Sequence, residues 1–264
     1  MKEFQKSAFF FLLPVLLIPF AIAVYNYHSG VSSFVWENFH IASVATALNP
    51  DDSTLRFEIG NYYFGGGAYN TEKAEDYFKK ALEIDTNISG AHYQIARIYF
   101  VRGNFNSALG EINKEIERHP DFRRSHYVRG LVNGYSGRLA EAESDFEEFL
   151  KWKPESWAGW NDLAWVYFQE GKYKEARDSA RRGLEIYPEN PWLLNSLGVA
   201  LLNTGQKYYA KEVFARALAA VSSMSPEDWG RAYPGNNPEI YTEGLSKMKQ
   251  SMRDNLKLLE DVNI

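Results

Sequence analysis

The sequence contains no cysteine. Disulfide bonds, cysteine-ligated zinc, iron–sulfur clusters, c-type haem attachment, thiol catalysis and a lipid-modified amino-terminal cysteine are therefore excluded. An excess of positive charge is lacking as well: the 264 residues carry a net charge of −5, which argues against a general nucleic-acid-binding protein. The 10 prolines and 19 glycines are too few for a collagenous or low-complexity chain.

The chain does have one long apolar run, Ala8–Tyr25, which carries no charged residue. As a helix this run would span roughly 27 Å, close to the ~30 Å hydrocarbon core of a bilayer. We predict a retained signal-anchor, a single transmembrane helix. A cleaved signal peptide, which would leave a secreted or periplasmic protein, is the alternative, because Ala21-Ile22-Ala23 resembles a signal-peptidase site. Lys2 and Lys6 precede the run, so the positive-inside rule leaves the amino terminus in the cytoplasm and the rest of the chain outside it.

Beyond this run the sequence repeats with a period of 34 residues, marked by Pro120, Pro154 and Pro188. Two positions of the period hold small residues, which are Gly60, Ala96, Gly130, Ala164 and Gly198 at the first and Ala74, Ala108, Ala142, Ala176 and Ala210 at the second. Between them recur glycines that end a helix in the left-handed conformation, at Gly103, Gly137, Gly171 and Gly205. Small residues let two helices approach to roughly 8–10 Å, so each period predicts an antiparallel helix pair.

These positions resemble the tetratricopeptide repeat, a helix–turn–helix unit. Five units follow one another, Ser53–Ile88, Ser89–Phe122, Arg123–Ser156, Trp157–Asn190 and Pro191–Met224. The fourth carries most of the family consensus, namely Trp160, Leu163-Ala164, Tyr167, Gly171, Tyr173, Ala176 and Pro188. The resemblance implies an all-α, right-handed solenoid, in which neighbouring repeats stack to bury a continuous core.

The repeats, residues 53–224, are flanked on both sides. Residues 28–52 follow the membrane segment (1–27) and predict a short linker, Tyr27–Ser33, and a half-repeat helix, Val35–Asn49. Residues 225–264 predict a connector with at most one helical turn and then a helix that begins at Asn237-Pro238. Its single apolar face consists of Tyr241, Leu245, Met248, Met252, Leu256 and Leu259. We expect this face to cap the fifth repeat, with binding of a separate partner as the alternative. Eleven or twelve helices and essentially no strand are predicted.

No residues show the spacing of a catalytic or metal site. His92 and His126 occupy the same position in the second and third units, but nothing in phase supplies a third metal ligand. Gly65-Gly66-Gly67 lacks the strand and the Gly-Lys-Ser/Thr of a phosphate-binding loop and predicts a lengthened turn. We therefore expect no cofactor, no metal and no enzymatic activity. An enzyme with an unrecognised site is an alternative that a deep polar pocket would revive.

The third unit places Arg129 where its neighbours have apolar residues. Some members of the family carry an Arg-Gly pair at this point, with an aspartate in the second helix; here these are Arg129-Gly130 and Asp145. A buried guanidinium needs a paired carboxylate. The hairpin therefore predicts a contact between Arg129 and Asp145 within about 4 Å.

In tetratricopeptide proteins the ligand usually lies in the concave groove lined by the first helix of each repeat. By this resemblance the partner-binding residues are Phe57, Asn61, Tyr93, Arg97, Tyr127, Leu131, Asn161, Trp165 and Asn195. The family's carboxylate clamp for chaperone tails needs a lysine where Phe57 stands, so we do not expect that activity. An aromatic groove with few charges favours an extended or helical peptide. Packing of Tyr93 and Tyr127 between repeats is the alternative interpretation.

The sequence thus predicts a non-catalytic protein–protein interaction scaffold at a membrane, which binds a protein or peptide partner and no nucleic acid. The resemblance is to membrane-anchored envelope proteins whose repeats recruit partners for the assembly of other proteins. A structural subunit of a larger membrane complex is the alternative function. Ala8, Ala21 and Ala23 do not form a small-residue face on which another membrane helix could pack. This observation disfavours the alternative function.

Overall fold

The computed structural model of the protein describes residues 27–232 and 235–259. The predicted membrane segment, Ala8–Tyr25, lies outside these residues, and its insertion stays a prediction. Within the described residues no helix is both long enough and apolar enough to cross a membrane.

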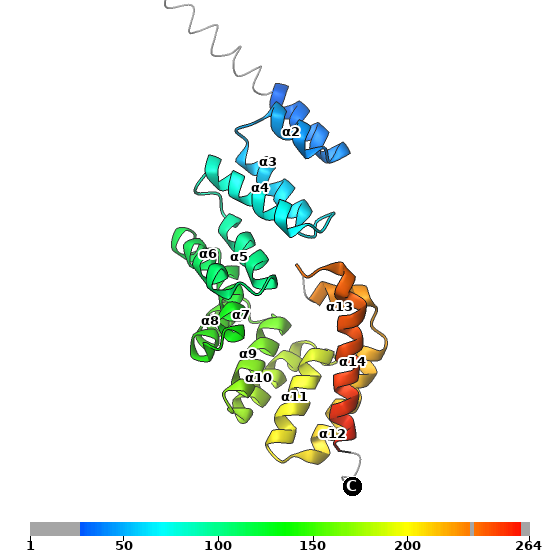
Figure 1. Cartoon of the computed structure of the whole chain (residues 1–264). Coiled ribbons are helices and arrows are strands. Elements are labelled where there is room, and N and C mark those ends of the chain that lie inside the picture. Colours follow the sequence, from blue (N-terminus) through cyan, green and yellow to red (C-terminus); the bar gives the residue numbers. More distant parts are fainter. Residues whose placement is uncertain (1–26, 233–234, 260–264) are drawn as a thin grey trace, which may run out of the picture.

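The described chain is all-α, and its only β pairing is an isolated bridge between Phe64 and Tyr69. Ten helices form the five predicted hairpins, and these are α3 (Ser53–Tyr63) with α4 (Thr71–Ile84), α5 (Ala91–Val101) with α6 (Phe105–Arg118), α7 (Arg124–Tyr135) with α8 (Leu139–Trp152), α9 (Trp157–Gln169) with α10 (Tyr173–Ile186) and α11 (Pro191–Asn203) with α12 (Lys207–Ser222). Successive hairpins stack into a curved solenoid (Figure 1).

The small residues of the period set the distance between the two helices of each hairpin. Where the first helix has glycine, the second presents a phenylalanine ring to it, as in the pairs Gly60–Phe78, Gly130–Phe146 and Gly198–Phe214. A methyl group on Gly130 would lie 2.9 Å from the Phe146 ring. The other two hairpins have alanine there and a smaller residue opposite, Ile112 or Ala180. The large ring thus lies only where the facing residue is glycine, so that this contact is not overpacked in any of the five hairpins.

The five alanines of the second helices are buried as predicted, with exposed fractions between 0% and 2%. The turn glycines also behave as predicted: Gly103, Gly137, Gly171 and Gly205 have φ between +74° and +81°. This left-handed conformation ends the first helix of each hairpin. The repeat assignment is confirmed at both positions.

The amino-terminal flank differs from the prediction. Residues 27–39 are helical, so Tyr27–Ser33 is not a linker, and α2 (Ala42–Leu48) follows after a break at His40, whose φ is +52°. Ser32 anchors the first of these helices, because its buried hydroxyl donates to the Ala45 carbonyl at 2.8 Å. The predicted half-repeat is thus a broken helical hairpin. It packs against Leu55 and Ile59 of α3.

The carboxy-terminal connector was also predicted wrongly, since it contains a helix of seven residues, α13 (Pro226–Ala232). Ser225 and Asp228 form a capping box: the Asp228 amide donates to Ser225 Oγ at 3.1 Å, and the Ser225 amide donates to Asp228 Oδ2 at 2.9 Å. Trp229 is buried against Gly244. With this helix and that of residues 27–39, the described chain has more than the predicted eleven or twelve helices.

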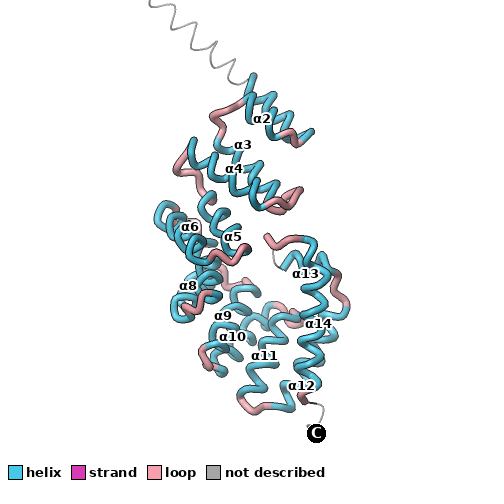
Figure 2. Tube along the Cα trace, viewed as in Figure 1, coloured by secondary structure: helices cyan, strands magenta, loops and turns pink. Residues whose placement is uncertain are grey.

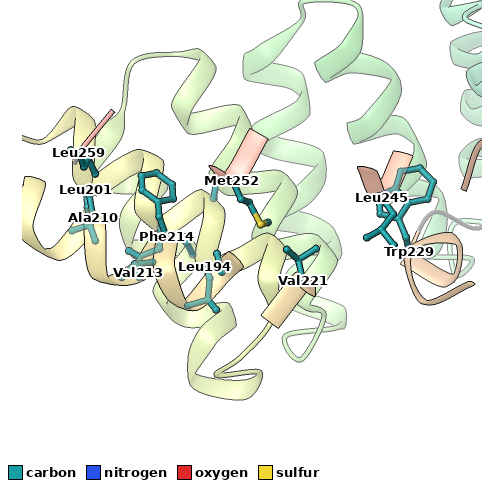
Figure 3. Packing of buried hydrophobic residues seen from close by; sticks show 14 residues of the cluster. Leu194, Leu201, Ala210, Val213, Phe214, Val221, Trp229, Leu245, Met252 and Leu259 are labelled. Atoms are coloured by element: carbon teal, nitrogen blue, oxygen red, sulfur yellow. The ribbon is translucent and has the colours of Figure 1, made fainter. Parts of the chain in front are cut away.

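The last helix begins as predicted. Asn237 caps a 3₁₀ turn (Pro238–Ile240) that leads directly into α14 (Tyr241–Lys257). Its apolar face meets α11 and α12, and Leu245, Met252 and Leu259 are buried in one cluster with Phe214 and Val221 (Figure 3). Tyr241, Met248 and Leu256 pack against the same cluster. The capping prediction is confirmed.

Candidate partner-binding groove

The chain after the fifth repeat returns to the beginning of the solenoid. Figure 2 shows α13 and α14 on the open side of the curve, with α13 facing α5. The Tyr69 hydroxyl, in the lengthened turn of the first repeat, donates to the Gly235 carbonyl at 3.0 Å. Gly235 has φ +101°, and a methyl group there would lie 2.9 Å from Arg97 Nη2. This contact bounds the concave face on the side opposite the repeats.

A cavity of about 180 Å³ lies on this concave face. Its walls are mainly aromatic rings from the first helices of successive repeats, and these are Tyr93, Phe100, Tyr127, Tyr135, Trp157 and Trp192. Ala232 and Asn236 of the returning segment complete the wall. The period of the repeats explains the arrangement, because equivalent positions of stacked helices line one surface.

A second cavity, of about 270 Å³, adjoins the first and shares Leu131, Tyr135, Asn161, Asp162 and Trp192 with it. Trp165 and Asn195 line it from the repeats, and Met248, Ser251 and Met252 line it from α14. The last helix therefore has two contacts: it caps the fifth repeat and forms one side of the groove.

Seven of the nine predicted partner-binding residues line the two cavities, which are Tyr93, Arg97, Tyr127, Leu131, Asn161, Trp165 and Asn195. Phe57 and Asn61 do not. The Phe57 ring packs on Phe78 with the ring centroids 5.4 Å apart, and Asn61 Oδ1 accepts a hydrogen bond from Gln94 Nε2 at 2.5 Å. The predicted aromatic row accordingly begins at Tyr93. The role of these residues in binding a partner stays a prediction.

Asp162 is the acidic group between the two cavities, and the sequence analysis did not select it. The Tyr127 hydroxyl donates to its Oδ2 at 2.6 Å, and Asn161 Nδ2 donates to its Oδ1 at 3.2 Å. Burial raises the pKa of Asp162 to about 6, although both hydrogen bonds act in the opposite direction. The signal in the sequence was a lone carboxylate within an aromatic segment, Trp157–Trp165.

Arg97 is a positively charged residue that lines the first cavity. Its Nη1 donates to Gln94 Oε1 at 2.7 Å. Its guanidinium carbon lies 4.9 Å from the Phe64 ring centroid and 5.6 Å from that of Tyr93. The arginine is therefore held in place by its own first helix and by the aromatic rings beside it.

Comparison with known proteins agrees with the repeat pattern. Two segments, residues 134–191 and 56–88, match models of the tetratricopeptide repeat. The chain is a tetratricopeptide repeat protein. Over 103 residues it is 31% identical to DnaJ homolog subfamily C member 3 of Rattus norvegicus, a match that covers 39% of this chain and 20% of that relative. The match to the rat protein thus spans about a fifth of that protein's length.

Solved structures share the fold of this tetratricopeptide repeat protein. PilW, a type IV pilus biogenesis factor, superposes with a TM-score of 0.59 at 18% identity, over 78% of this chain and 92% of PilW. YrrB, described as having an unusual peptide-binding site, superposes with a TM-score of 0.57 at 17% identity, over 69% of this chain and 93% of YrrB. Identities this low establish the fold alone.

A second acidic residue of the tetratricopeptide repeats, Asp145, is paired with an arginine, whereas Asp162 has hydrogen bonds from neutral groups only. The predicted pair is confirmed, since Arg129 Nη2 lies 2.7 Å from Asp145 Oδ1 and Arg129 Nε lies 2.9 Å from the same oxygen. Asn133 Nδ2 donates to Asp145 Oδ2 at 2.9 Å. Burial alone would raise the pKa of Asp145, but hydrogen bonds from His126, Arg129 and Asn133 hold it below the ordinary value.

The two repeat-related histidines each face a carboxylate. His92 Nδ1 lies 2.6 Å from Glu111 Oε2, and His126 Nδ1 lies 3.4 Å from Asp145 Oδ1. Among residues 27–232 and 235–259 no three histidine, aspartate or glutamate side chains are grouped to hold a metal ion. The same helix-to-helix contact recurs in neighbouring repeats, which is what a structural pairing of the two helices requires.

Proposed function

We propose that this protein is a non-catalytic interaction scaffold that binds an extended segment of a partner protein in its concave groove. The aromatic cavity contributed by α5, α7, α9 and α11 is the observation that carries the proposal. Aromatic side chains offer large contact areas and lose little rotamer entropy on binding, as interface anchors do.

We further propose that the scaffold is held at a membrane by Ala8–Tyr25. Support comes from the helical hairpin that follows directly, residues 27–48, which has several exposed apolar side chains, namely Tyr27, Phe34, Phe39, Ile41 and Val44. Aromatic residues next to a membrane-spanning segment favour the bilayer interface. The repeats then stand outside the cytoplasm, with the groove turned to partners there.

The relatives support a scaffold of this kind. The rat DnaJ homolog is similar to part of this chain, and PilW, which has the same fold, is described as a type IV pilus biogenesis factor. In our proposal this protein has a comparable role: it holds a partner segment without transforming it.

Site-specific photocrosslinking from the groove tests the peptide-binding proposal. We would introduce Tyr135→p-benzoylphenylalanine in the full-length protein, because Tyr135 is exposed and lines both cavities. The matched control is the same substitution at Tyr208, an exposed tyrosine of α12 that lines neither cavity. Mass spectrometry after irradiation in cells should identify a partner segment from position 135 and not from position 208. Crosslinks from position 208 alone would show that the partner binds outside the groove, near α12.

Protease accessibility tests the topology. In a bacterial host, protease added to intact spheroplasts should digest the repeats, since the positive-inside rule leaves Lys2 and Lys6 in the cytoplasm. Cell fractionation separates a retained anchor from a cleaved signal: the anchored protein stays with the membrane. Protection of the repeats in intact spheroplasts would contradict the proposed location under both alternatives.

A further inference from the structure

Asp162 is an uncompensated negative charge in an aromatic groove. Among the described residues no ion pair involves it, in contrast to Asp145, which is bound by Arg129. Its two hydrogen bonds come from neutral groups, the Tyr127 hydroxyl and the Asn161 amide. A half-buried carboxylate that lacks a cation is costly to the folded protein unless something outside the chain neutralises it.

The surroundings of Asp162 are suited to a cation. Tyr135 and Trp192 line both cavities that meet at this carboxylate. The Trp192 ring lies 5.1 Å from that of Trp157, and the Tyr135 ring stacks on Trp165 at 5.2 Å, so the rings are held by their neighbours. Aromatic faces attract a cation within about 6 Å of the ring centroid, and more strongly where water is displaced.

The size of the cavities indicates what kind of cation would enter. Each cavity, at about 180 and 270 Å³, is smaller than the roughly 300–1,000 Å³ typical of small-molecule sites. Such volumes suit single side chains of an extended chain that runs along the groove. A lysine or arginine side chain combines an apolar stem, which fits the aromatic walls, with a charged end, which fits Asp162.

We propose that Asp162, Tyr135 and Trp192 form a subsite for a lysine or arginine side chain of the partner segment. The subsite rests on the proposed groove function and specifies its ligand: an extended segment with a basic residue, whose neighbouring apolar side chains fill the remaining cavity. Asn161 and Tyr127 orient the carboxylate, and Ser196 in turn orients Asn161, because its hydroxyl donates to Asn161 Oδ1 at 2.9 Å.

Selection from a peptide library tests the subsite. Full-length protein in detergent would be mixed with acetylated, amidated short peptides of randomised flanks and one fixed central residue. The central residue is lysine, norleucine or glutamate in three otherwise identical pools. Norleucine keeps the apolar stem of lysine and removes its charge. Retained peptides are identified by mass spectrometry, and individual affinities follow by fluorescence anisotropy.

Wild-type protein should retain lysine peptides about tenfold better than their norleucine counterparts, the gain of one favourable charged contact. Asp162→Asn, which keeps the shape and one acceptor oxygen, should abolish this preference, and Asp162→Glu should restore part of it. Asp51→Asn removes the same charge from an exposed turn and should leave the preference unchanged. Circular dichroism of each variant reports whether the helices are intact.

The outcomes separate the subsite from the groove. Equal retention of the lysine and norleucine pools would overturn the cationic subsite and leave the peptide groove standing. A preference for lysine that survives Asp162→Asn would also overturn the subsite. Retention of no pool at all, by a wild-type protein with intact helices, would overturn both the subsite and the proposed peptide-binding function.

Discussion

Asp145 and Asp162 belong to neighbouring repeats, and their surroundings differ in kind. Asp145, in α8, is bound by an arginine, an asparagine and a histidine, all from α7 of the same hairpin. Asp162, in α9, has only neutral donors and faces two cavities. The pKa of the first is lowered and that of the second is raised to about 6. A carboxylate that is paired with an arginine holds two helices together, whereas a carboxylate without an ion pair is available to a ligand.

Removing the arginine should have the largest effect on stability. Arg129→Ala leaves the buried Asp145 carboxylate without its cation and should lower the free energy of unfolding by about 3 kcal/mol. Arg181→Ala, at an exposed position of α10, should change it by less than about 0.5 kcal/mol. Urea denaturation measures both. Equal changes in the free energy of unfolding for the two variants would show that the Arg129–Asp145 pair contributes no more to stability than an exposed arginine does.

Binding should depend on the aromatic residues of the groove. Tyr93→Ala and Trp165→Ala should each weaken partner capture by about 2 kcal/mol, roughly thirtyfold, because each removes an aromatic wall of a cavity. The control is Tyr208→Ala, which removes an exposed ring outside both cavities. The affinity of each variant is measured with the partner segment that crosslinking identifies. Unchanged affinity of both groove variants would show that the partner binds elsewhere on the protein.

Replacing the Asp162 carboxylate with a neutral side chain should stabilise the protein in the absence of a ligand. The raised pKa of Asp162 means that its stabilising contribution is complete only at acidic pH and is lost as pH rises through about 6. Asp162→Asn should therefore raise the free energy of unfolding at neutral pH by about 1 to 2 kcal/mol, and the gain should vanish below about pH 4. Tyr135 of α7 lines the same groove, and burial raises the pKa of its hydroxyl, which therefore does not titrate in this range.

Asp145→Asn provides the opposite case. The lowered pKa of Asp145 gives stability that is present above about pH 4 and is lost as pH falls through its folded-state pKa. Asp145→Asn should therefore destabilise the protein at neutral pH, where Asp162→Asn stabilises it. Urea denaturation across a pH series compares the two variants directly, and a loss of stability at neutral pH in both would refute the distinction between the two carboxylates.

The smallest effect concerns the contact that bounds the groove. Tyr69→Phe removes the hydrogen bond to the Gly235 carbonyl and should cost about 1 kcal/mol. Hydrogen exchange should quicken in α13 and in residues 235–240, and it should stay unchanged in α7 and α8, the hairpin that contains Asp145. Unchanged exchange in that segment would mean that packing of Gly235 against Phe64 and Arg97 holds it without the hydroxyl.

The parts of the fold that the sequence predicted are those set by the 34-residue period. The buried alanines, the left-handed turn glycines and the Arg129–Asp145 pair all depend on contacts within one hairpin. The helix of residues 27–39 and α13 were missed because one rests on a buried serine bond to α2 and the other on a capping box within a proline- and glycine-containing connector.

The candidate site was predictable only in part, because the repeat pattern does not predict contacts between side chains of different repeats. Repeat position identifies Tyr93, Tyr127 and Trp165 as residues of the inner surface, but it places Phe57 there as well, although Phe57 is taken up by packing on Phe78. Asp162 lies beside a predicted residue and gains its properties from rings of other repeats and from α14. Only the assembled solenoid brings these groups together.

The hydrogen bond between Tyr69 and Gly235 joins residues 166 apart in a protein whose other contacts are mostly between neighbouring repeats. Repeat arrays of this type fold by local steps, each of which closes a short loop. This contact closes a loop around almost the whole array and can form only after residue 235 has been synthesised. We therefore expect the growing chain to build its hairpins first and to acquire its final curvature last, so that the groove is open throughout synthesis and bounded only at the end.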